Sequence, residues 1–191
     1  MGIALRIENW CRRIRHRKGY GVHSPSDYFL ITSVIYENLP FYAFKELHDL
    51  PMKRVYREKV DKLIFRLANH FQPSIWVNDD PDNQATEKYI HAACPHAIQM
   101  SIDEIIASGK TPELVHIGSS DYEKHFNQLL PLVGNSTLFI IGTPDENKEK
   151  SEWWKQVIAD KRTGVTFDLF DVGLVFFDKK RFKEHRIVNF F

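Results

Sequence analysis

The sequence predicts an α/β fold in which a mostly parallel β-sheet is covered by helices on both faces. From residue 74 onward, short apolar segments of strand length alternate with segments of helical periodicity. Repeated β-α units need crossover connections, which place helices on both faces of a parallel sheet. The first forty-odd residues are instead basic and helical in pattern. We therefore expect an N-terminal helical extension, residues 1–50, followed by one α/β domain, residues 51–191.

Composition and charge describe a folded protein with no marked preference for polyanions. The chain has 191 residues, of which 43% are hydrophobic and 27% are charged, and its formal net charge is +1. A chain of this length can bury one sizeable core. Cys11 and Cys94 form neither a CxxC pair nor a disulfide framework, which favours a reducing, cytoplasmic location. No apolar run approaches the roughly 18 residues of a membrane span, so neither a span nor a signal peptide is predicted.

An amphipathic helix is predicted at the N-terminus. Its apolar residues Ile3, Ile7, Trp10 and Ile14 form one stripe, which is expected to dock on the protein's own core. Glycines end this helix soon afterwards. Five cations occupy the rest of the helix and its end: Arg12, Arg13, Arg15, Arg17 and Lys18. They form either a solvated face or, alternatively, a contact for RNA or a membrane surface.

The elements of the α/β domain follow from apolar spacing and from capping signals. A long helix ends before Pro73, because proline disfavours helix in the preceding residue. Ser120 and Glu123 have the spacing of a capping box that starts one later helix, and Thr143 and Glu146 form a second such box. A further helix covers residues 84–93, and the predicted strands cover residues 74–77, 97–102, 114–117, 136–141, 165–170, 174–177 and 187–191.

The strand order along the chain also suggests where a ligand would bind. We expect the last two strands to pair antiparallel around the charged turn at residues 178–184. The earlier strands are expected to be parallel, and in such sheets ligands bind beyond the carboxyl ends of the strands. The segments that follow strand ends are residues 78–83, 103–104, 118–121 and 142–145.

Two parts of the chain resemble a known family. The stretch GYGVHSPSDYFLIT, residues 19–32, is similar to the GVHSP segment of a small, largely bacterial group of class I S-adenosylmethionine-dependent methyltransferases. The stretches SEWWKQV and GVTFDLFDVGLVFFDKKRFKEH resemble the C-terminal part of the same group. The resemblance implies a Rossmann-like methyltransferase fold with an antiparallel C-terminal strand, and S-adenosylmethionine as the cofactor. By position, it implies that the cofactor-binding residues are Asn78, Asp79, Asp80, Asp103 and Gly118.

The expected cofactor edge departs from the pattern of that group in several places. The loop NDDPDNQAT, residues 78–86, contains no glycine, although glycines there normally let the backbone approach a nucleotide. Gly118, and Gly142 with Thr143, stand where acidic residues are expected, and one β-α unit is missing or shortened. These losses predict a methyltransferase-like pseudoenzyme with an eroded cofactor site, which acts as a non-catalytic binding or structural module.

Two alternatives remain open. The chain could be an active methyltransferase on a small molecule or nucleic acid, in which Asp79 or Asp80 and Asp103 take the cofactor. The candidate general base is then His23, since histidine titrates near neutral pH, although this residue could instead pin the N-terminal helices to the sheet. The second alternative is RNA association through the basic helix. No metal site is predicted, because the acidic loop that also contains Asp82 lacks the glycine and distal glutamate of a calcium loop.

Overall fold

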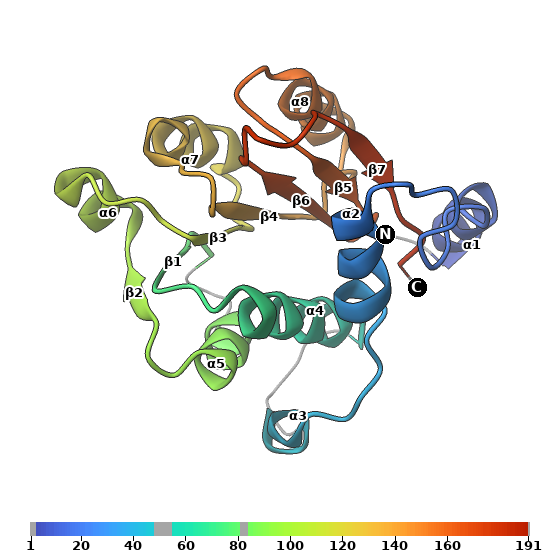
Figure 1. Ribbon diagram of the computed structural model, residues 1–191, viewed down its shortest axis with the longest axis horizontal. Coiled ribbons are helices and arrows are strands. Elements are labelled where there is room, and N and C mark those ends of the chain that lie inside the picture. The colour runs from blue at the N-terminus through green and yellow to red at the C-terminus, as the bar shows by residue number, and fades with distance from the viewer. Residues whose placement is uncertain (1–2, 48–54, 81–83, 191) are drawn as a thin grey trace.

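In the computed structural model, a seven-stranded sheet forms the centre of the protein and helices cover both of its faces (Figure 1). The structure describes residues 3–47, 55–80 and 84–190. The strands lie in the order β2-β1-β3-β4-β6-β5-β7. They are β1 (Ile75–Asn78), β2 (Ile98–Met100), β3 (Leu114–Ile117), β4 (Leu138–Gly142), β5 (Thr166–Asp168), β6 (Val172–Phe176) and β7 (His185–Ile187). The mostly parallel sheet covered by helices confirms the predicted fold class.

Two hydrophobic cores hold the helices against the sheet. In β4, the side chains of Leu138 and Ile140 pack into one core and those of Phe139 and Ile141 pack into the other, so both faces are buried. The first core is shared with the π-helix η1 (Leu30–Ile35), α3 (Tyr42–Leu47), α4 (Val55–Phe71) and α5 (Gln84–Ala93). The second is shared with α6 (Ile102–Ser108), α7 (Tyr122–Leu129), the 3-10 helix η2 (Leu130–Leu132) and α8 (Lys148–Ala159). None of the described helices is long and apolar enough to cross a membrane.

The chain changes direction across the sheet at β1. This strand pairs in parallel with β2 on one side and with β3 on the other. After β2, the chain passes through α6 and returns to the far side of β1 as β3. The loops that follow β1 and β3 therefore diverge at their carboxyl ends, which is the switch point where doubly wound sheets commonly bind ligands.

The C-terminal strands are arranged differently from the prediction. An antiparallel strand is present in this part of the sheet, namely β6, which runs antiparallel to both β4 and β5. The predicted pairing of the last two strands is wrong, because β7 instead pairs in parallel with β5. Both edges of β6 are already occupied by β4 and β5, so the last strand can add only to the open edge of β5.

The predicted helix starts were also wrong in two places. α7 begins after Asp121, whose side chain makes no capping hydrogen bond. α8 begins after Asn147, whose side chain accepts the N-terminal cap hydrogen bond. A capping box is present at a position where none was predicted, at Ser101 and Glu104 before α6. The capping motif is short, and several overlapping sites in one loop match it, so tertiary packing decides which one is used.

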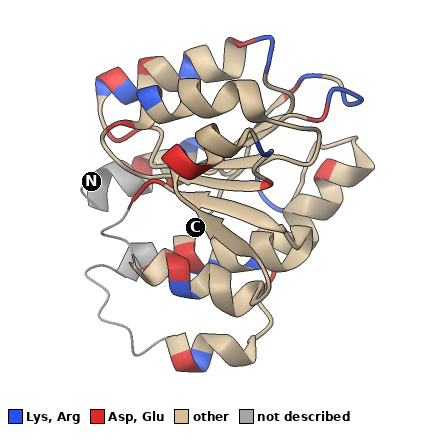
Figure 2. Cartoon of the chain, turned by 90° about the vertical axis from the view of Figure 1, so that its left-hand side faces the viewer, with Lys and Arg blue, Asp and Glu red and all other residues tan. Residues whose placement is uncertain are grey.

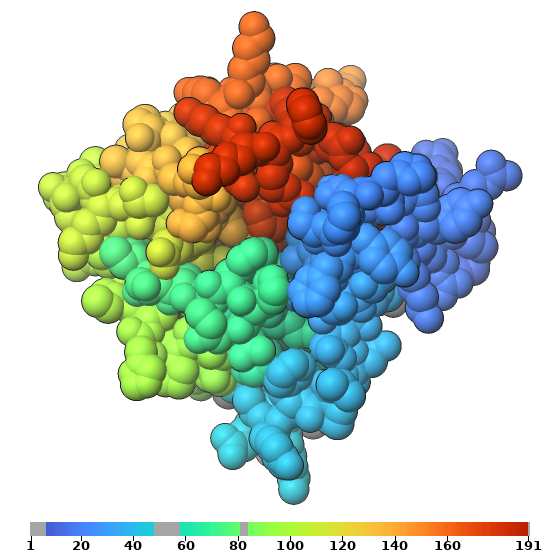
Figure 3. Space-filling view, in the orientation of Figure 1, coloured from blue at the N-terminus to red at the C-terminus, as the bar shows by residue number. Residues whose placement is uncertain are grey.

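The segment that follows helix α1 (Ile3–Arg12) docks on the domain through polar contacts, and part of the predicted apolar stripe is exposed. Ile7 and Ile14 of the expected stripe are 59% and 45% exposed, and the side chain of Ile3 is not among those described. The segment after α1 instead contacts the C-terminal strand region, where the N–H of Asn189 donates to the carbonyl oxygen of His16 (2.9 Å). Figure 3 shows the N-terminal residues in blue lying directly against the C-terminal residues in red.

The GVHSP segment is anchored by an aspartate two residues beyond it. Ser24 caps α2 (Pro25–Phe29) by accepting a hydrogen bond from the backbone N–H of Asp27. The buried carboxylate of Asp27 pairs with Arg181 in the turn before β7 and with Arg186 in β7. A buried carboxylate with two guanidinium partners holds this segment against the last strand of the sheet.

Candidate functional site at the switch point of the sheet

The carboxylate of Asp79 links the loops that follow β1 and β3. Its Oδ1 accepts hydrogen bonds from the backbone N–H groups of Gly118 (2.6 Å) and Ser119 (3.0 Å). Its Oδ2 accepts one from the Ser119 hydroxyl (2.9 Å) and lies 2.9 Å from Nδ1 of His125. The side chain is fully buried. These polar contacts offset the loss of hydration that a buried carboxylate suffers.

Asn78 extends the same network to the neighbouring strands. The sheet register places Asn78 opposite His116, and Oδ1 of Asn78 lies 2.8 Å from Nδ1 of the imidazole. Its Nδ2 donates to the carbonyl oxygen of Asp80 (3.0 Å) and to the carboxylate of Glu87 (3.3 Å). Gln99 donates to the same oxygen of Glu87 (2.9 Å). Residues of β1, β2, β3 and α5 are thus joined around the carboxyl end of β1.

The space beside Gly118 is occupied by side chains. A Cβ at this position would lie 2.9 Å from Cε1 of His116 and 3.3 Å from the Cβ of Asp80. A separation of 2.9 Å is shorter than carbon atoms tolerate without a shift of one neighbour. An aspartate, which the family resemblance leads one to expect here, would therefore have to displace the imidazole of His116.

Asp79, His125 and Ser119 have the residue types of a nucleophilic triad but not its geometry. In such triads the histidine contacts the carboxylate with one nitrogen and the hydroxyl with the other. Here the carboxylate (2.9 Å) and the hydroxyl (3.3 Å) both lie near Nδ1 of His125. The Ser119 proton is directed to Asp79. This arrangement holds the carboxylate in place and does not activate the hydroxyl as a nucleophile.

A second cluster occupies the carboxyl ends of β4 and β5. The guanidinium of Arg13 forms a two-pronged pair with Asp168 at the end of β5, with distances of 2.7 and 3.1 Å. It also donates to the backbone carbonyl of Asp168 (3.0 Å) and lies 3.9 Å from the carboxylate of Asp145, which follows β4. Phe170, two residues after Asp168, has a φ of 74°, a conformation that is unusual for a bulky side chain. Because Arg13 contacts both Asp168 and Asp145, the segment after α1 covers this part of the sheet edge.

The structure brings together most of the residues predicted to bind the cofactor. Asn78, Asp79, Asp80 and Gly118 meet at the switch point. Asp103 lies exposed in the first turn of α6, after the strand that neighbours β1, and makes no hydrogen bond to this network within the described part of the chain. Glu104 beside it folds back on the N–H and hydroxyl of Ser101, and these hydrogen bonds lower its carboxyl pKa.

His23, the candidate general base, is exposed in the segment before α2. Among the residues that the structure describes, it makes no hydrogen bond to the Asp79 network. The buried anchor of its segment is Asp27, four residues later. The catalytic role of His23 stays a prediction.

Two members of the network, His116 and His125, lie outside the segments predicted from the sequence, whereas Ser119 lies in the predicted segment 118–121. His116 carried a usable signal, because it is a polar residue inside the apolar strand segment LVHI and a buried polar side chain needs a partner. His125 carried none, since its partner Asp79 is 46 residues away in the sequence.

The acidic loop after β1 does not form a metal centre within the described residues. Asp79 is directed toward backbone N–H groups, and Asp82 lies outside the described residues. No group of three or more histidine, cysteine or acidic side chains is arranged to hold a metal ion in the part of the chain that the structure describes.

The basic patch predicted near α1 loses one of its members. Arg13 is buried in its pair with Asp168, so it is not available for a phosphate contact. Arg12 is exposed and pairs with Glu8 one helical turn earlier. The remaining cations, Arg15, Arg17 and Lys18, are exposed. Elsewhere, Figure 2 shows basic and acidic segments interspersed over the helices.

Comparisons with known proteins give a loose likeness in architecture. No family model matches the chain, and no curated protein matches it. A Staphylococcus aureus protein provisionally assigned as a caffeoyl-CoA O-methyltransferase is 10% identical, with 80% of this chain and 98% of that chain covered and a TM-score of 0.49. The O-methyltransferase TomG from Streptomyces achromogenes, solved in complex with SAM, is 11% identical over 78% and 93% of the two chains, with a TM-score of 0.48. A Geobacter sulfurreducens methyltransferase is 10% identical over 73% and 91%, with a TM-score of 0.45.

Proposed function

We propose that this chain is a divergent methyltransferase-like protein whose inherited cofactor site is no longer used, and that it acts as a non-catalytic binding or structural module. The observation that supports this most directly is the position of Asp79. Its carboxylate takes up the backbone N–H groups of Gly118 and Ser119 at the switch point. Donors that a bound ligand would need there are already engaged within the protein.

The packing around these donors supports the same proposal. His116 and Asp80 fill the space beside Gly118, and Arg13 covers the ends of β4 and β5. A shallow cavity of about 370 Å³ lies nearby, at the start of α7. It is lined by Tyr122, Glu123 and Glu149 among others, but not by Asp79 or Gly118. This packing supports the proposal that the switch point does not hold S-adenosylmethionine.

Calorimetric titration with S-adenosylmethionine tests the proposal. We expect no heat of binding at micromolar protein and cofactor, and no change in unfolding temperature at millimolar cofactor. The second readout is sensitive, because a ligand at a hundredfold excess over its Kd stabilises the folded state by about 2.7 kcal/mol. Low-micromolar binding would overturn the proposal and favour the alternative of an active methyltransferase.

A further inference from the structure

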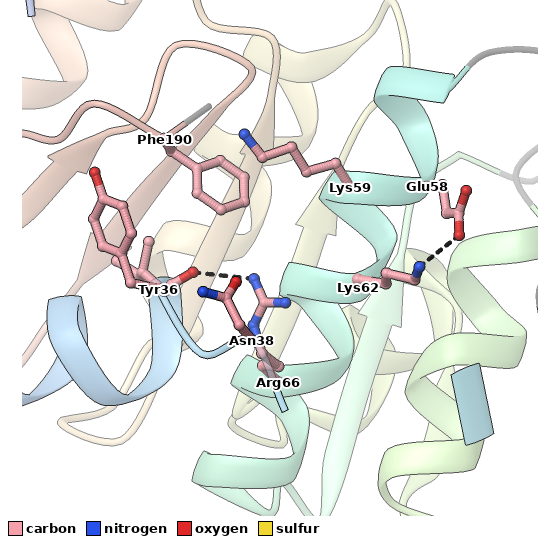
Figure 4. Close-up of a pocket in the computed structure, with 8 residues that line it drawn as sticks. Tyr36, Asn38, Glu58, Lys59, Lys62, Arg66 and Phe190 are labelled. Carbon is pink, nitrogen blue, oxygen red and sulfur yellow. Dashed lines mark hydrogen bonds and ion pairs between the residues drawn. The ribbon is translucent and has the colours of Figure 1, made fainter. Parts of the chain in front are cut away.

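A cavity of about 290 Å³ lies between η1, α4 and the residues that follow β7, and cations outnumber carboxylates in its lining (Figure 4). Lys59, Lys62 and Arg66 line it from successive turns of α4, together with the single carboxylate of Glu58. The other lining residues are Ile35, Tyr36, Asn38 and Phe190. Phe190 follows β7 (His185–Ile187) in the sequence, so it lies beyond the carboxyl end of that strand. The cavity shares no residue with the switch-point network.

Arg66 is the most constrained of the three cations. Its Nε and one terminal nitrogen donate to the backbone carbonyl oxygens of Val34 (2.9 Å) and Ile35 (3.1 Å), at the end of the π-helix. These carbonyls have no partner within the helix itself. Among the described residues, no carboxylate lies within ion-pair distance of its guanidinium. Burial lowers the pKa of Arg66 to about 10, and the charge of Glu37 only partly opposes this effect.

The partly buried guanidinium of Arg66 donates hydrogen bonds to neutral carbonyl oxygens, and no negative charge is paired with it among the described residues. Buried charges are usually paired, since dehydration of an unpaired ion costs several kcal/mol. A guanidinium has five N–H donors, and the two carbonyls use only part of this capacity. In Figure 4 the guanidinium lies beside the amide of Asn38, at the cavity. The remaining donors could take both oxygens of a carboxylate or phosphate.

The two lysines add charge to the same space. Lys62 lies 2.6 Å from the carboxylate of Glu58, and the lining as a whole has three cations and one carboxylate. The ammonium of Lys59 lies 4.0 Å from the centre of the Phe190 ring. Ile35 and Phe190 add apolar surface to the lining.

We propose that this cavity binds a small organic anion, with a phosphate or carboxylate group held by Arg66 and Lys62 and a compact apolar body against Ile35 and Phe190. The volume is at the lower end of the range for small-molecule sites, roughly 300 Å³ and above. A nucleotide cofactor would not fit in it. The site is independent of the proposed function, because neither the Asp79 network nor the cofactor is involved.

Calorimetry on the full chain with three probes tests the site: phenyl phosphate, benzoate and the uncharged benzyl alcohol. We expect one or both anions to bind in the micromolar to millimolar range, and benzyl alcohol not to bind. The stronger anion identifies the preferred group. Affinity should fall as salt is added, since the attraction is electrostatic. No binding of either anion, or equal binding of benzyl alcohol, would overturn the proposal.

Matched variants locate the binding. Lys62→Met should weaken the preferred anion about tenfold, as the loss of one charge-assisted hydrogen bond predicts. Lys155→Met is the control, because Lys155 has a similar intrahelical pair with Glu152 on an exposed face of α8. Arg66→Lys keeps the positive charge but loses the planar guanidinium that can donate two parallel hydrogen bonds. This variant should also weaken binding of the anion. Circular dichroism checks that it stays folded. If Lys62→Met and Lys155→Met bind equally well, the cavity is not the site. Affinity for the preferred anion should be the same with and without S-adenosylmethionine, because the cavity shares no residue with the switch point. The outcome of this test is therefore separate from that of the proposed function.

Discussion

Arg13 and Asp168 form a buried two-pronged ion pair across 155 residues of sequence. Each side chain is only 10% exposed. The pair connects the end of the N-terminal helix to the end of β5, so the N-terminal segment is part of the packed structure at the sheet edge.

Replacing Arg13 with methionine should strongly destabilise the protein. The substitution leaves the carboxylate of Asp168 buried with fewer partners, which typically costs about 3 kcal/mol or more. Urea denaturation of Arg13→Met and of the adjacent control Arg12→Met measures the effect. The Arg12 variant should change little, since its pair with Glu8 is exposed. Equal unfolding midpoints for the two variants would show that the buried pair contributes no stability.

Asp79→Asn should destabilise the protein although the two side chains have nearly the same shape. The amide oxygen of the asparagine can still accept from the N–H groups of Gly118 and Ser119. Its NH₂ group, however, replaces the oxygen that accepts from the Ser119 hydroxyl and lies beside Nδ1 of His125. We expect a loss of about 2 kcal/mol in the free energy of unfolding. Asp103→Asn, on an exposed helix start, is the control and should leave that free energy unchanged. A similar result for both would mean that the network at Asp79 is dispensable.

Gly118→Ala tests how closely the switch point is filled. The new methyl group would meet His116 at 2.9 Å, and overpacking of this kind typically costs about 1 to 3 kcal/mol. Gly142→Ala is a matched control at the end of β4, where the closest atoms lie at 3.4 Å, an ordinary contact distance. Thermal unfolding should separate the two variants. If Gly118→Ala is as stable as Gly142→Ala, there is room beside Gly118 and the proposed function loses support.

Tyr89 should make the protein sensitive to alkaline pH. Burial, followed by the charges of Glu58 and Asp61, raises its pKa from 10.0 to about 12. The unfolded chain therefore releases this proton first. The stabilisation is fully present below pH 10 and is lost as the pH rises from 10 toward 12. Denaturation across this range should show a steeper loss for the natural protein than for Tyr89→Phe.

The same substitution should be tolerated at neutral pH. The hydroxyl of Tyr89 is buried and has no hydrogen-bond partner among the described residues, so removing it also removes an uncompensated polar group. We expect Tyr89→Phe to be as stable as the natural protein or more stable by about 1 kcal/mol. Tyr20→Phe, at a 79% exposed position, is the control. A marked destabilisation by Tyr89→Phe would show that the hydroxyl does have a partner.

Sequence patterns predicted the central strands of the fold well and its polar contacts poorly. β1, β3 and β4 are predominantly apolar and most of their residues are buried, so composition identifies them. The loop residues Asn78, Asp79 and Gly118 were also predicted to lie at one edge, because parallel strands align their carboxyl ends. Their partners could not be predicted, since the contacts of His125 and Arg13 depend on which helix packs beside which strand. The spacing of apolar residues along the sequence does not indicate which helix packs beside which strand.

The ion pairs of Asp27 have a consequence for the order in which the chain folds. Asp27 finds its partners Arg181 and Arg186 at 154 and 159 residues further along. Contacts between such distant positions close a long loop and tend to slow folding. On the ribosome, the pair of Arg13 cannot form until β5 has emerged, and the two pairs of Asp27 also need residues 181–186. The N-terminal segment therefore cannot dock before the C-terminal strands of the sheet are available, and this docking is expected to be a late step in the folding of the domain.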